Sequence, residues 1–248
     1  MTDGAGLTSR GRTDAAAGTS AGRTDAAAGT SAESAGVVDR LRGATGVFGG
    51  TFDPIHLAHL AVAEAARDTF GLARVLFIPA AQPPHKPGRD ISPVEDRLAM
   101  VEAAVEGNPA FEVSRLEVER SGPSYTVDTL AALCDAGPRD HLALILSSES
   151  YGEFATWHEP RRILDLADLI VAPRVGYADA DRELIARQYP DAPAAVAFMD
   201  GPRIRLSASE IRQRAAEGRS VRYLVPDAVA AYIGDHGLYQ QHRRDHRS

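Results

Sequence analysis

Short apolar runs alternate with helical patterns along most of the chain. The runs are continuous and apolar, which is typical of strands buried on both faces of a sheet. One further run, residues 111–118, alternates polar and apolar positions as a strand with one exposed face does. The predicted strands are residues 45–48, 74–79, 111–118, 142–146 and 169–172.

The intervals between these runs carry helical patterns. Residues 92–95 (SPVE) form a favourable helix start, with a hydroxyl cap, a proline and a glutamate in sequence. Strands that alternate with helices predict βαβ units, so the predicted fold class is α/β, a doubly wound, Rossmann-like, mostly parallel sheet with a C-terminal helical extension. The other predicted helices are residues 56–69, 126–136, 180–188, 209–217 and 226–236.

The two ends of the chain lack this pattern. Residues 12–20 (RTDAAAGTS) recur unchanged as residues 23–31, an 11-residue repeat with almost no large apolar side chains. Such a segment cannot bury a core. We therefore expect a disordered tail over residues 1–42, one folded domain over residues 43–240 and a second disordered tail over residues 241–248.

Composition narrows the classes of function mainly by exclusion. The net charge of −7 provides no basic field for nucleic acid or for an anionic membrane surface. No apolar run approaches the ~18 residues of a membrane-spanning helix. The single cysteine, Cys134, excludes an intrachain disulfide and a multi-cysteine metal site. We expect a cytoplasmic protein that binds neither nucleic acid nor membrane.

Residues 46–59 (GVFGGTFDPIHLAH) carry the clearest candidate chemistry. Glycines after an apolar strand let the backbone approach an anion without a Cβ in the way. Asp53 is predicted to cap a helix that has Pro54 at its first position, and a helix start offers free N–H groups to phosphate. His56 and His59 fall on the same side of that first turn. The segment is predicted to hold phosphates.

Three other interpretations of this segment are weaker. A P-loop would end in Gly-Lys-Ser or Gly-Lys-Thr, and a zinc-binding helix would space its histidines at i and i+4 with a glutamate between them. A tight strand-to-helix turn with two incidental surface histidines explains the glycines but leaves the combination with Asp53, Pro54, His56 and His59 unexplained.

The pattern G-x-F-G-G-T-F-D-P-x-H-x-x-H resembles the signature of the nucleotidylyltransferase superfamily. In this full form it is similar to bacterial nicotinate-nucleotide adenylyltransferases, and the resemblance extends over roughly residues 44–239. Five further segments resemble the same family in the same order. They are residues 83–86 (PPHK), 123–130 (PSYTVDTL), 155–158 (ATWH), 206–212 (LSASEIR) and 223–229 (YLVPDAV).

The resemblance implies adenylyl transfer from Mg-ATP to nicotinate mononucleotide, which yields nicotinate adenine dinucleotide and pyrophosphate in NAD biosynthesis. Such a reaction depends on alignment and on stabilisation of phosphate charge, and Mg²⁺ would arrive with the triphosphate. The resemblance assigns catalytic contacts to His56, His59, Lys86 and Arg212. It assigns ATP contacts to Gly49, Gly50, Thr51, Phe52, His56, His59, Ser207, Ser209 and Arg212, and mononucleotide contacts to Lys86, Tyr125, Thr126, Glu149, Trp157 and Arg174.

The chain departs from the family pattern at a few positions. Ala58 replaces the glycine of H-x-G-H, which adds a methyl group where a glycine permits close approach. Ser147 and Glu149 occupy the positions of a G-x-D motif, so a glycine's freedom at positive φ is lost and the acidic arm is longer. Ala208 and Ser209 for Ser-Thr are milder changes.

These departures leave two alternatives open. One is another small-molecule adenylyltransferase that acts on nicotinamide mononucleotide or phosphopantetheine. The other is a catalytically weakened nucleotide-binding sensor. The sequence also leaves the oligomeric state open, a homo-oligomer included.

Overall fold

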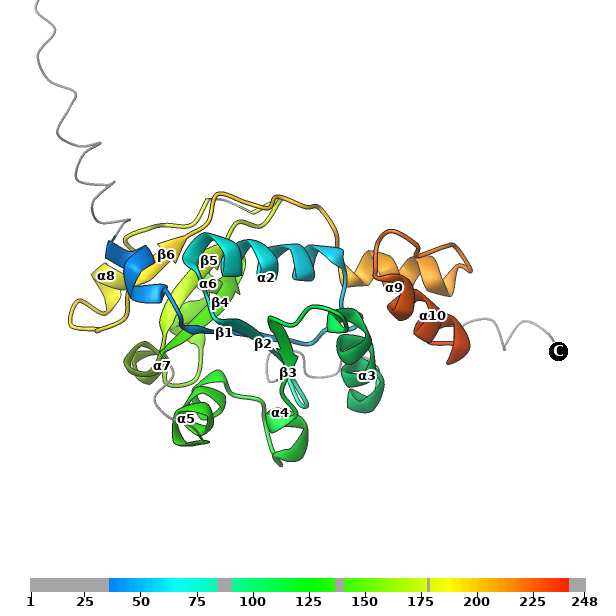
Figure 1. Cartoon of the computed structure of the whole chain (residues 1–248), viewed down its shortest axis with the longest axis horizontal. Helices are drawn as coiled ribbons and strands as arrows, with labels where there is room; N and C mark the ends of the chain where they lie inside the picture. Colours follow the sequence, from blue (N-terminus) through cyan, green and yellow to red (C-terminus); the bar gives the residue numbers. More distant parts are fainter. Residues whose placement is uncertain (1–35, 84–90, 137–140, 178, 241–248) are drawn as a thin grey trace, which may run out of the picture.

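The apolar runs of the sequence form the strands of one parallel sheet. The computed structural model describes residues 36–83, 91–136, 141–177 and 179–240 (Figure 1). Its six strands have the order β3-β2-β1-β4-β5-β6, and every neighbouring pair is parallel. The strands are β1 (Thr45–Gly50), β2 (Arg74–Pro79), β3 (Phe111–Val113), β4 (Leu142–Ser147), β5 (Asp168–Ala172) and β6 (Val196–Phe198).

The chain winds outward in both directions from β1, which pairs with β2 on one side and with β4 on the other. This reversal of strand order confirms the predicted doubly wound fold. In open parallel sheets, ligands bind outside the carboxyl ends of the strands at such a reversal, which here lies between β1 and β4.

Helices cover both faces of the sheet (Figure 1). Side chains that alternate along a strand point to opposite faces, so β2 sends Val75 and Phe77 into one apolar cluster and Leu76 and Ile78 into the other. α2, α3, α9 and α10 contribute to the first cluster, and α5 to α8 contribute to the second. The helices are α2 (Leu57–Phe70), α3 (Val94–Val105), α4 (Leu116–Glu119), α5 (Thr126–Ala136), α6 (Ser148–Gly152), η1 (Phe154–Thr156), α7 (Pro160–Leu166), α8 (Leu184–Gln188), α9 (Ala208–Ala216) and α10 (Asp227–Asp235).

The predicted strand over residues 111–118 is wrong in its second half. β3 ends at Val113, and residues 116–119 form the short helix α4. The Ser114 hydroxyl accepts a hydrogen bond from the Leu116 amide (3.3 Å), which turns the chain at this point. Glu117 is buried on the inner side of this turn, whereas the apolar Leu116 and Val118 are only partly buried, so burial here does not follow the alternation of a strand.

The helix after β1 begins later than the sequence suggests. α2 starts at Leu57 with His56 as its N-cap, so the prediction that Asp53 caps this helix is wrong. The Asp53 carboxylate is buried and instead accepts hydrogen bonds from the Tyr239 hydroxyl (2.8 Å) and the Ser92 amide (3.3 Å). The Asp53 side chain therefore connects distant segments of the chain.

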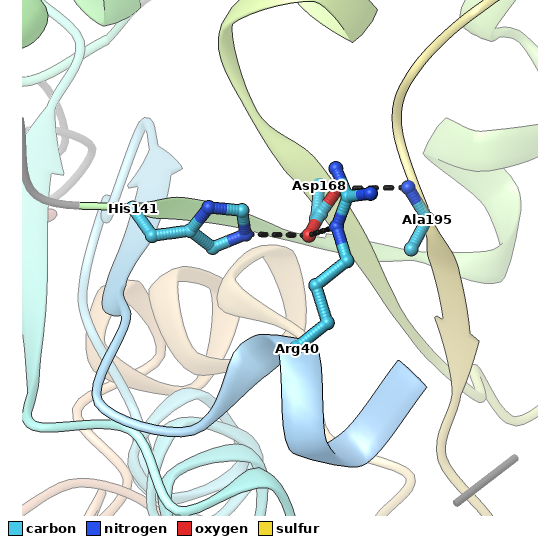
Figure 2. A network of polar contacts seen from close by, with 4 residues as sticks. All are labelled: Arg40, His141, Asp168 and Ala195. Atoms are coloured by element: carbon cyan, nitrogen blue, oxygen red, sulfur yellow. Dashed lines mark hydrogen bonds and ion pairs between the residues drawn. The ribbon is translucent and has the colours of Figure 1, made fainter. Parts of the chain in front are cut away.

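A helical segment over residues 36–41 packs against the amino ends of the strands. Leu41 is fully buried, and Arg40 donates from Nε to Asp168 at the start of β5 (2.7 Å; Figure 2). Part of the segment predicted as a tail over residues 1–42 thus belongs to the packed domain. The repeat, the rest of that tail and the predicted tail over residues 241–248 lie outside the described residues.

Asp168 is the centre of a closed polar cluster at this edge of the sheet (Figure 2). Its carboxylate is 1% exposed and lies 2.7 Å from the Ala195 amide and 2.5 Å from Nε2 of His141, besides its bond to Arg40.

Within the described ranges, no helix combines the length and the apolar character that a membrane span requires.

Candidate active site

The turn that leaves β1 is built around the ring of Phe52. Phe52 has a φ of 48°, and its ring packs 5.9 Å from Phe48 and 6.0 Å from Phe77 between centroids. A Cβ on Gly50 would lie 2.9 Å from this ring, so packing alone requires a glycine there. A Cβ on Gly49 would meet no atom within 4 Å. Packing therefore does not explain the glycine at position 49. The open space beside Gly49 leaves its backbone exposed at the carboxyl edge of the sheet.

The two histidines stack on each other at the start of α2. Their ring centroids are 3.6 Å apart with an interplanar angle of 13°. The His56 amide donates to Nδ1 of His59 (3.2 Å). A neutral imidazole that accepts at Nδ1 carries its proton on Nε2, so this bond selects the tautomer in which Nε2 of His59 is a donor.

His56 is the more buried of the pair, with 5% of its surface exposed. Burial, together with the positive charge of Arg174, lowers the pKa of His56 from 6.5 to about 4. His56 is therefore neutral at pH 7. A protonated ring would bind a phosphate more strongly, so the neutral state differs from what a phosphate ligand alone would favour. Its buried Nδ1 has no hydrogen-bond partner among the described residues.

α9 approaches this turn from the far end of the chain. Its N-cap, Ser207, accepts a hydrogen bond from the Glu210 amide (3.2 Å). Arg212 donates from Nη1 to the Asp53 carbonyl (2.7 Å) and from Nη2 to the Ser209 hydroxyl (3.3 Å). The structure thus brings Ser207, Ser209 and Arg212 to the segment that carries the histidines.

A second group of predicted residues gathers near the start of α5. The ring of Tyr125 stacks on His158, with centroids 4.3 Å apart, and the ring of Trp157 lies 5.5 Å from Phe154. Thr126 begins α5 immediately after Tyr125. Sequence reasoning did not select His158, although its position beside Trp157 was a signal that could have found it.

Glu149 and Arg174 face each other across the carboxyl ends of β4 and β5. They form an ion pair, and the Arg174 guanidinium lies 5.0 Å from the centroid of the Tyr177 ring. A cavity of about 290 Å³ beside them is lined by Ser148, Arg174 and Arg182, among other residues. The positive charge of Arg174 also contributes to the lowered pKa of His56.

The serines of the segment Ser147-Ser148-Glu149 fit their backbone without strain. Ser147 has a φ of −78° and caps α6 by accepting a hydrogen bond from the Ser150 amide (3.2 Å). Ser148 accepts one from the Arg174 amide (3.1 Å). The expectation that Ser147 removes a needed freedom at positive φ is therefore wrong, because the backbone at this position is extended.

Two further predictions have a limited structural test. Lys86 and the rest of the PPHK segment after Pro83 lie outside the described residues. In the described ranges, no group of three or more His, Cys, Asp or Glu side chains could hold a metal ion.

Comparisons with known proteins find the same family repeatedly. A cytidylyltransferase-like family model matches residues 47–214. The chain is 48% identical over 195 residues to a probable nicotinate-nucleotide adenylyltransferase of Thermomicrobium roseum, covering 79% of this chain and 91% of the relative. A protein of the same name from Salinibacter ruber is 48% identical over 197 residues, with 79% and 97% covered.

Solved structures share the fold at much lower sequence identity. The nicotinic acid mononucleotide adenylyltransferase of Plasmodium falciparum, complexed with NaAD, superimposes with a TM-score of 0.65 at 17% identity, covering 79% of this chain and 96% of that one. A complex of the same protein with APC has a TM-score of 0.64.

Proposed function

Since the chain belongs to the nicotinate-nucleotide adenylyltransferase family, we propose that it transfers the adenylyl group of Mg-ATP to nicotinate mononucleotide. A phosphate oxygen of the mononucleotide attacks the α-phosphorus of ATP. The bond from that phosphorus to the bridging oxygen breaks, and pyrophosphate leaves with the electron pair. The products are nicotinate adenine dinucleotide and pyrophosphate, which makes this a step of NAD biosynthesis.

The observation that carries this proposal is the pair of stacked histidines at the start of α2. The bond from the His56 amide to Nδ1 of His59 leaves Nε2 of His59 as a donor. A donor held in place before the reaction stabilises charge that develops on the α-phosphate oxygens without having to reorganise. The neutral state of His56 supports a role as a hydrogen-bonding and stacking partner that keeps His59 in position.

The triphosphate would occupy the space between the turn after β1 and the start of α9. The open face of Gly49 admits phosphate close to the backbone, and the positive dipole ends of α2 and α9 favour an anion. Arg212 adds a guanidinium whose fork suits phosphate oxygens. Ser207, Ser209, Gly50, Thr51 and Phe52 complete the donor side of this proposal, and Lys86 belongs to it through the sequence resemblance alone.

The mononucleotide would occupy a crevice at the carboxyl ends of β4 and β5, where Arg174 lines the cavity of about 290 Å³. Trp157 supplies a π-face for the pyridine ring, while Tyr125 and Thr126 offer polar contacts for its carboxylate. Glu149 and Arg174 would contact the ribose or the phosphate. Their ion pair is partly exposed, so it can exchange partners at small cost.

Mg²⁺ enters this proposal as part of the Mg-ATP substrate. Magnesium supplies neutralisation of phosphate charge when ATP binds. The chain's own contribution is the alignment of the two substrates.

The test is a pyrophosphate-release assay with Mg-ATP and, in separate reactions, nicotinate mononucleotide and its amide analogue. The proposal expects the acid to have the higher kcat/KM. Turnover of neither compound would contradict adenylyl transfer itself. Turnover of the amide alone would leave the reaction intact and contradict the proposed acceptor.

A further inference from the structure

Arg97 occupies a position that the pattern of its helix reserves for an apolar residue. Arg97, Val101 and Val105 follow each other at intervals of four along α3, and all three are buried. Arg97 is 1% exposed, and among the described residues no carboxylate lies within hydrogen-bond distance of its guanidinium. A buried charge is costly unless its donors are satisfied, so the partners of this guanidinium identify what it holds.

Among the described residues, the guanidinium donates to backbone carbonyls alone, and these belong to three different segments. Nε bonds the Ser92 carbonyl (2.9 Å), at the entry to α3. Nη1 bonds the carbonyls of Thr51 (2.8 Å), after β1, and Ala80 (2.7 Å), after β2. Nη2 bonds the Ala81 carbonyl (3.3 Å). Three nitrogens in a planar fork are needed to reach these separate positions.

The same segments are joined on their other side by Asp53. The backbone of Ser92 is bonded to both residues. Its amide donates to the Asp53 carboxylate (3.3 Å), and its carbonyl accepts from Arg97. Burial lowers the pKa of Arg97, and the negative charge of Asp53 opposes this shift. Asp53 in turn accepts from Arg212 through its own carbonyl (2.7 Å). Arg97 is thus connected to the proposed donor side through two routes, Thr51 and Asp53.

We infer that Arg97 is a positioning residue for adenylyl transfer. It fixes the turn that contains Gly49, Thr51 and Phe52 relative to the segment after β2, and so it sets where the triphosphate lies. It does not contact the reacting atoms. This inference rests on the proposed function, and it predicts that loss of the fork impairs the use of ATP more than the use of the mononucleotide.

The test compares Arg97→Lys with Arg115→Lys. Lysine keeps the positive charge but concentrates its donors on one nitrogen, so it cannot hold all three segments. Arg115 provides the matched control. It is a half-exposed arginine whose Nη1 pairs with Glu102 (3.2 Å), a residue of the helix α3 that also carries Arg97. Folding of each variant is verified by circular dichroism, and Arg97→Met serves as a second variant if the buried ammonium prevents folding.

Steady-state kinetics give the first readout. We expect Arg97→Lys to lower kcat/KM for ATP about 100-fold, because displacements of about 1 Å have effects of this size in aligned reactions. The KM for the mononucleotide should change less than threefold, and Arg115→Lys should match the wild type. A folded Arg97 variant with an unchanged kcat/KM for ATP would overturn the inference. An inactive wild type would instead contradict the proposed function.

Hydrogen–deuterium exchange gives a second readout that does not depend on activity. Peptides that cover residues 46–56 and 80–83 should exchange at least tenfold faster in Arg97→Lys than in the wild type, while peptides of β4 and β5 should not change. A uniform increase over the whole domain would show that Arg97 only stabilises the fold, and that result would overturn the positioning role.

Discussion

Two buried polar clusters lie at opposite edges of the same sheet, and they differ in how their hydrogen bonds are completed. At the amino edge, the Asp168 carboxylate is surrounded by donors from Arg40, His141 and Ala195 (Figure 2). At the carboxyl edge, His56 is buried to a similar degree, yet its Nδ1 has no hydrogen-bond partner in the described part of the chain. The first cluster is complete without a ligand.

This difference separates stability from function. A closed set of hydrogen bonds to a buried carboxylate holds together the segments that supply the donors. An unpartnered buried ring nitrogen costs stability, and this one lies at the edge where ligands bind in parallel sheets. We expect substitutions at the two edges to have opposite effects on unfolding and on turnover.

The largest effect is expected at the carboxyl edge from His59→Ala. Removal of a preorganised donor to a charged transition state costs about 100-fold to 1000-fold in kcat. Thermal unfolding should change little, because His59 is only partly buried. The assay is pyrophosphate release at saturating substrates, alongside a melting curve followed by circular dichroism.

The matched control for His59→Ala is His236→Ala. His236 also stacks on an aromatic ring, with its centroid 3.9 Å from that of Tyr232, but it belongs to α10, outside the proposed site. It should retain full turnover. Equal activity of the two variants would remove His59 from the mechanism.

The neutral state of His56 predicts a dependence of stability on pH. Its pKa is about 4 in the folded protein and 6.5 as a reference for the unfolded chain. Between these values the unfolded state binds a proton that the folded state does not, so the free energy of unfolding falls as the pH drops from 6.5 to 4. The total loss from this group is about 3 kcal/mol.

Urea unfolding of the wild type and of His56→Asn at several pH values between 7 and 4 measures this loss. The variant should lack the share of the slope that His56 contributes, and the two proteins should differ least in slope above pH 7. Identical pH slopes for both proteins would show that His56 is not held neutral by burial.

A smaller effect, of the opposite kind, is expected at the amino edge from Asp168→Asn. The amide cannot accept from all three donors, and a buried group that loses its partner costs about 1 to 3 kcal/mol in the free energy of unfolding. Urea unfolding should show this loss, while kcat and both KM values should stay within twofold of the wild type. A large loss of turnover in the folded variant would break the contrast between the two edges.

The smallest effect is expected from Trp157→Ala. Loss of a π-face for a stacked ring costs about 1 to 2 kcal/mol, so the KM for the mononucleotide should rise about tenfold while the KM for ATP stays unchanged. Trp157→Phe keeps an aromatic face and should recover most of the affinity. An equal change in both KM values would place Trp157 outside the mononucleotide crevice.

The sequence predicted the centre of the fold well because apolar runs report burial directly. The structure has β2 (Arg74–Pro79) and α5 (Thr126–Ala136) at the predicted residues. It also contains β6 and α7, which were not predicted. β6 is a short edge strand of three residues, and α7 carries two arginines after its proline, so neither has a strong pattern of its own. Tertiary packing decides both.

The site was predictable in its residue types but not in their states. The spacing of His56 and His59 indicates a shared face, yet the stacking of their rings is seen only in the structure. The lowered pKa of His56 follows from burial and from the charge of Arg174, which is distant in sequence. The partners of Asp53 also come from remote segments, since Tyr239 lies 186 residues away. Arg97 was visible as a charge within an apolar stripe, but only the structure identifies the carbonyls that it binds.

The most direct test uses ATP that is labelled at the α-phosphorus. The label is followed through the reaction with nicotinate mononucleotide. Attack at that phosphorus predicts that all transferred label appears in nicotinate adenine dinucleotide and that the pyrophosphate carries none. Label in the pyrophosphate, or a labelled product without the mononucleotide, would contradict adenylyl transfer by this protein.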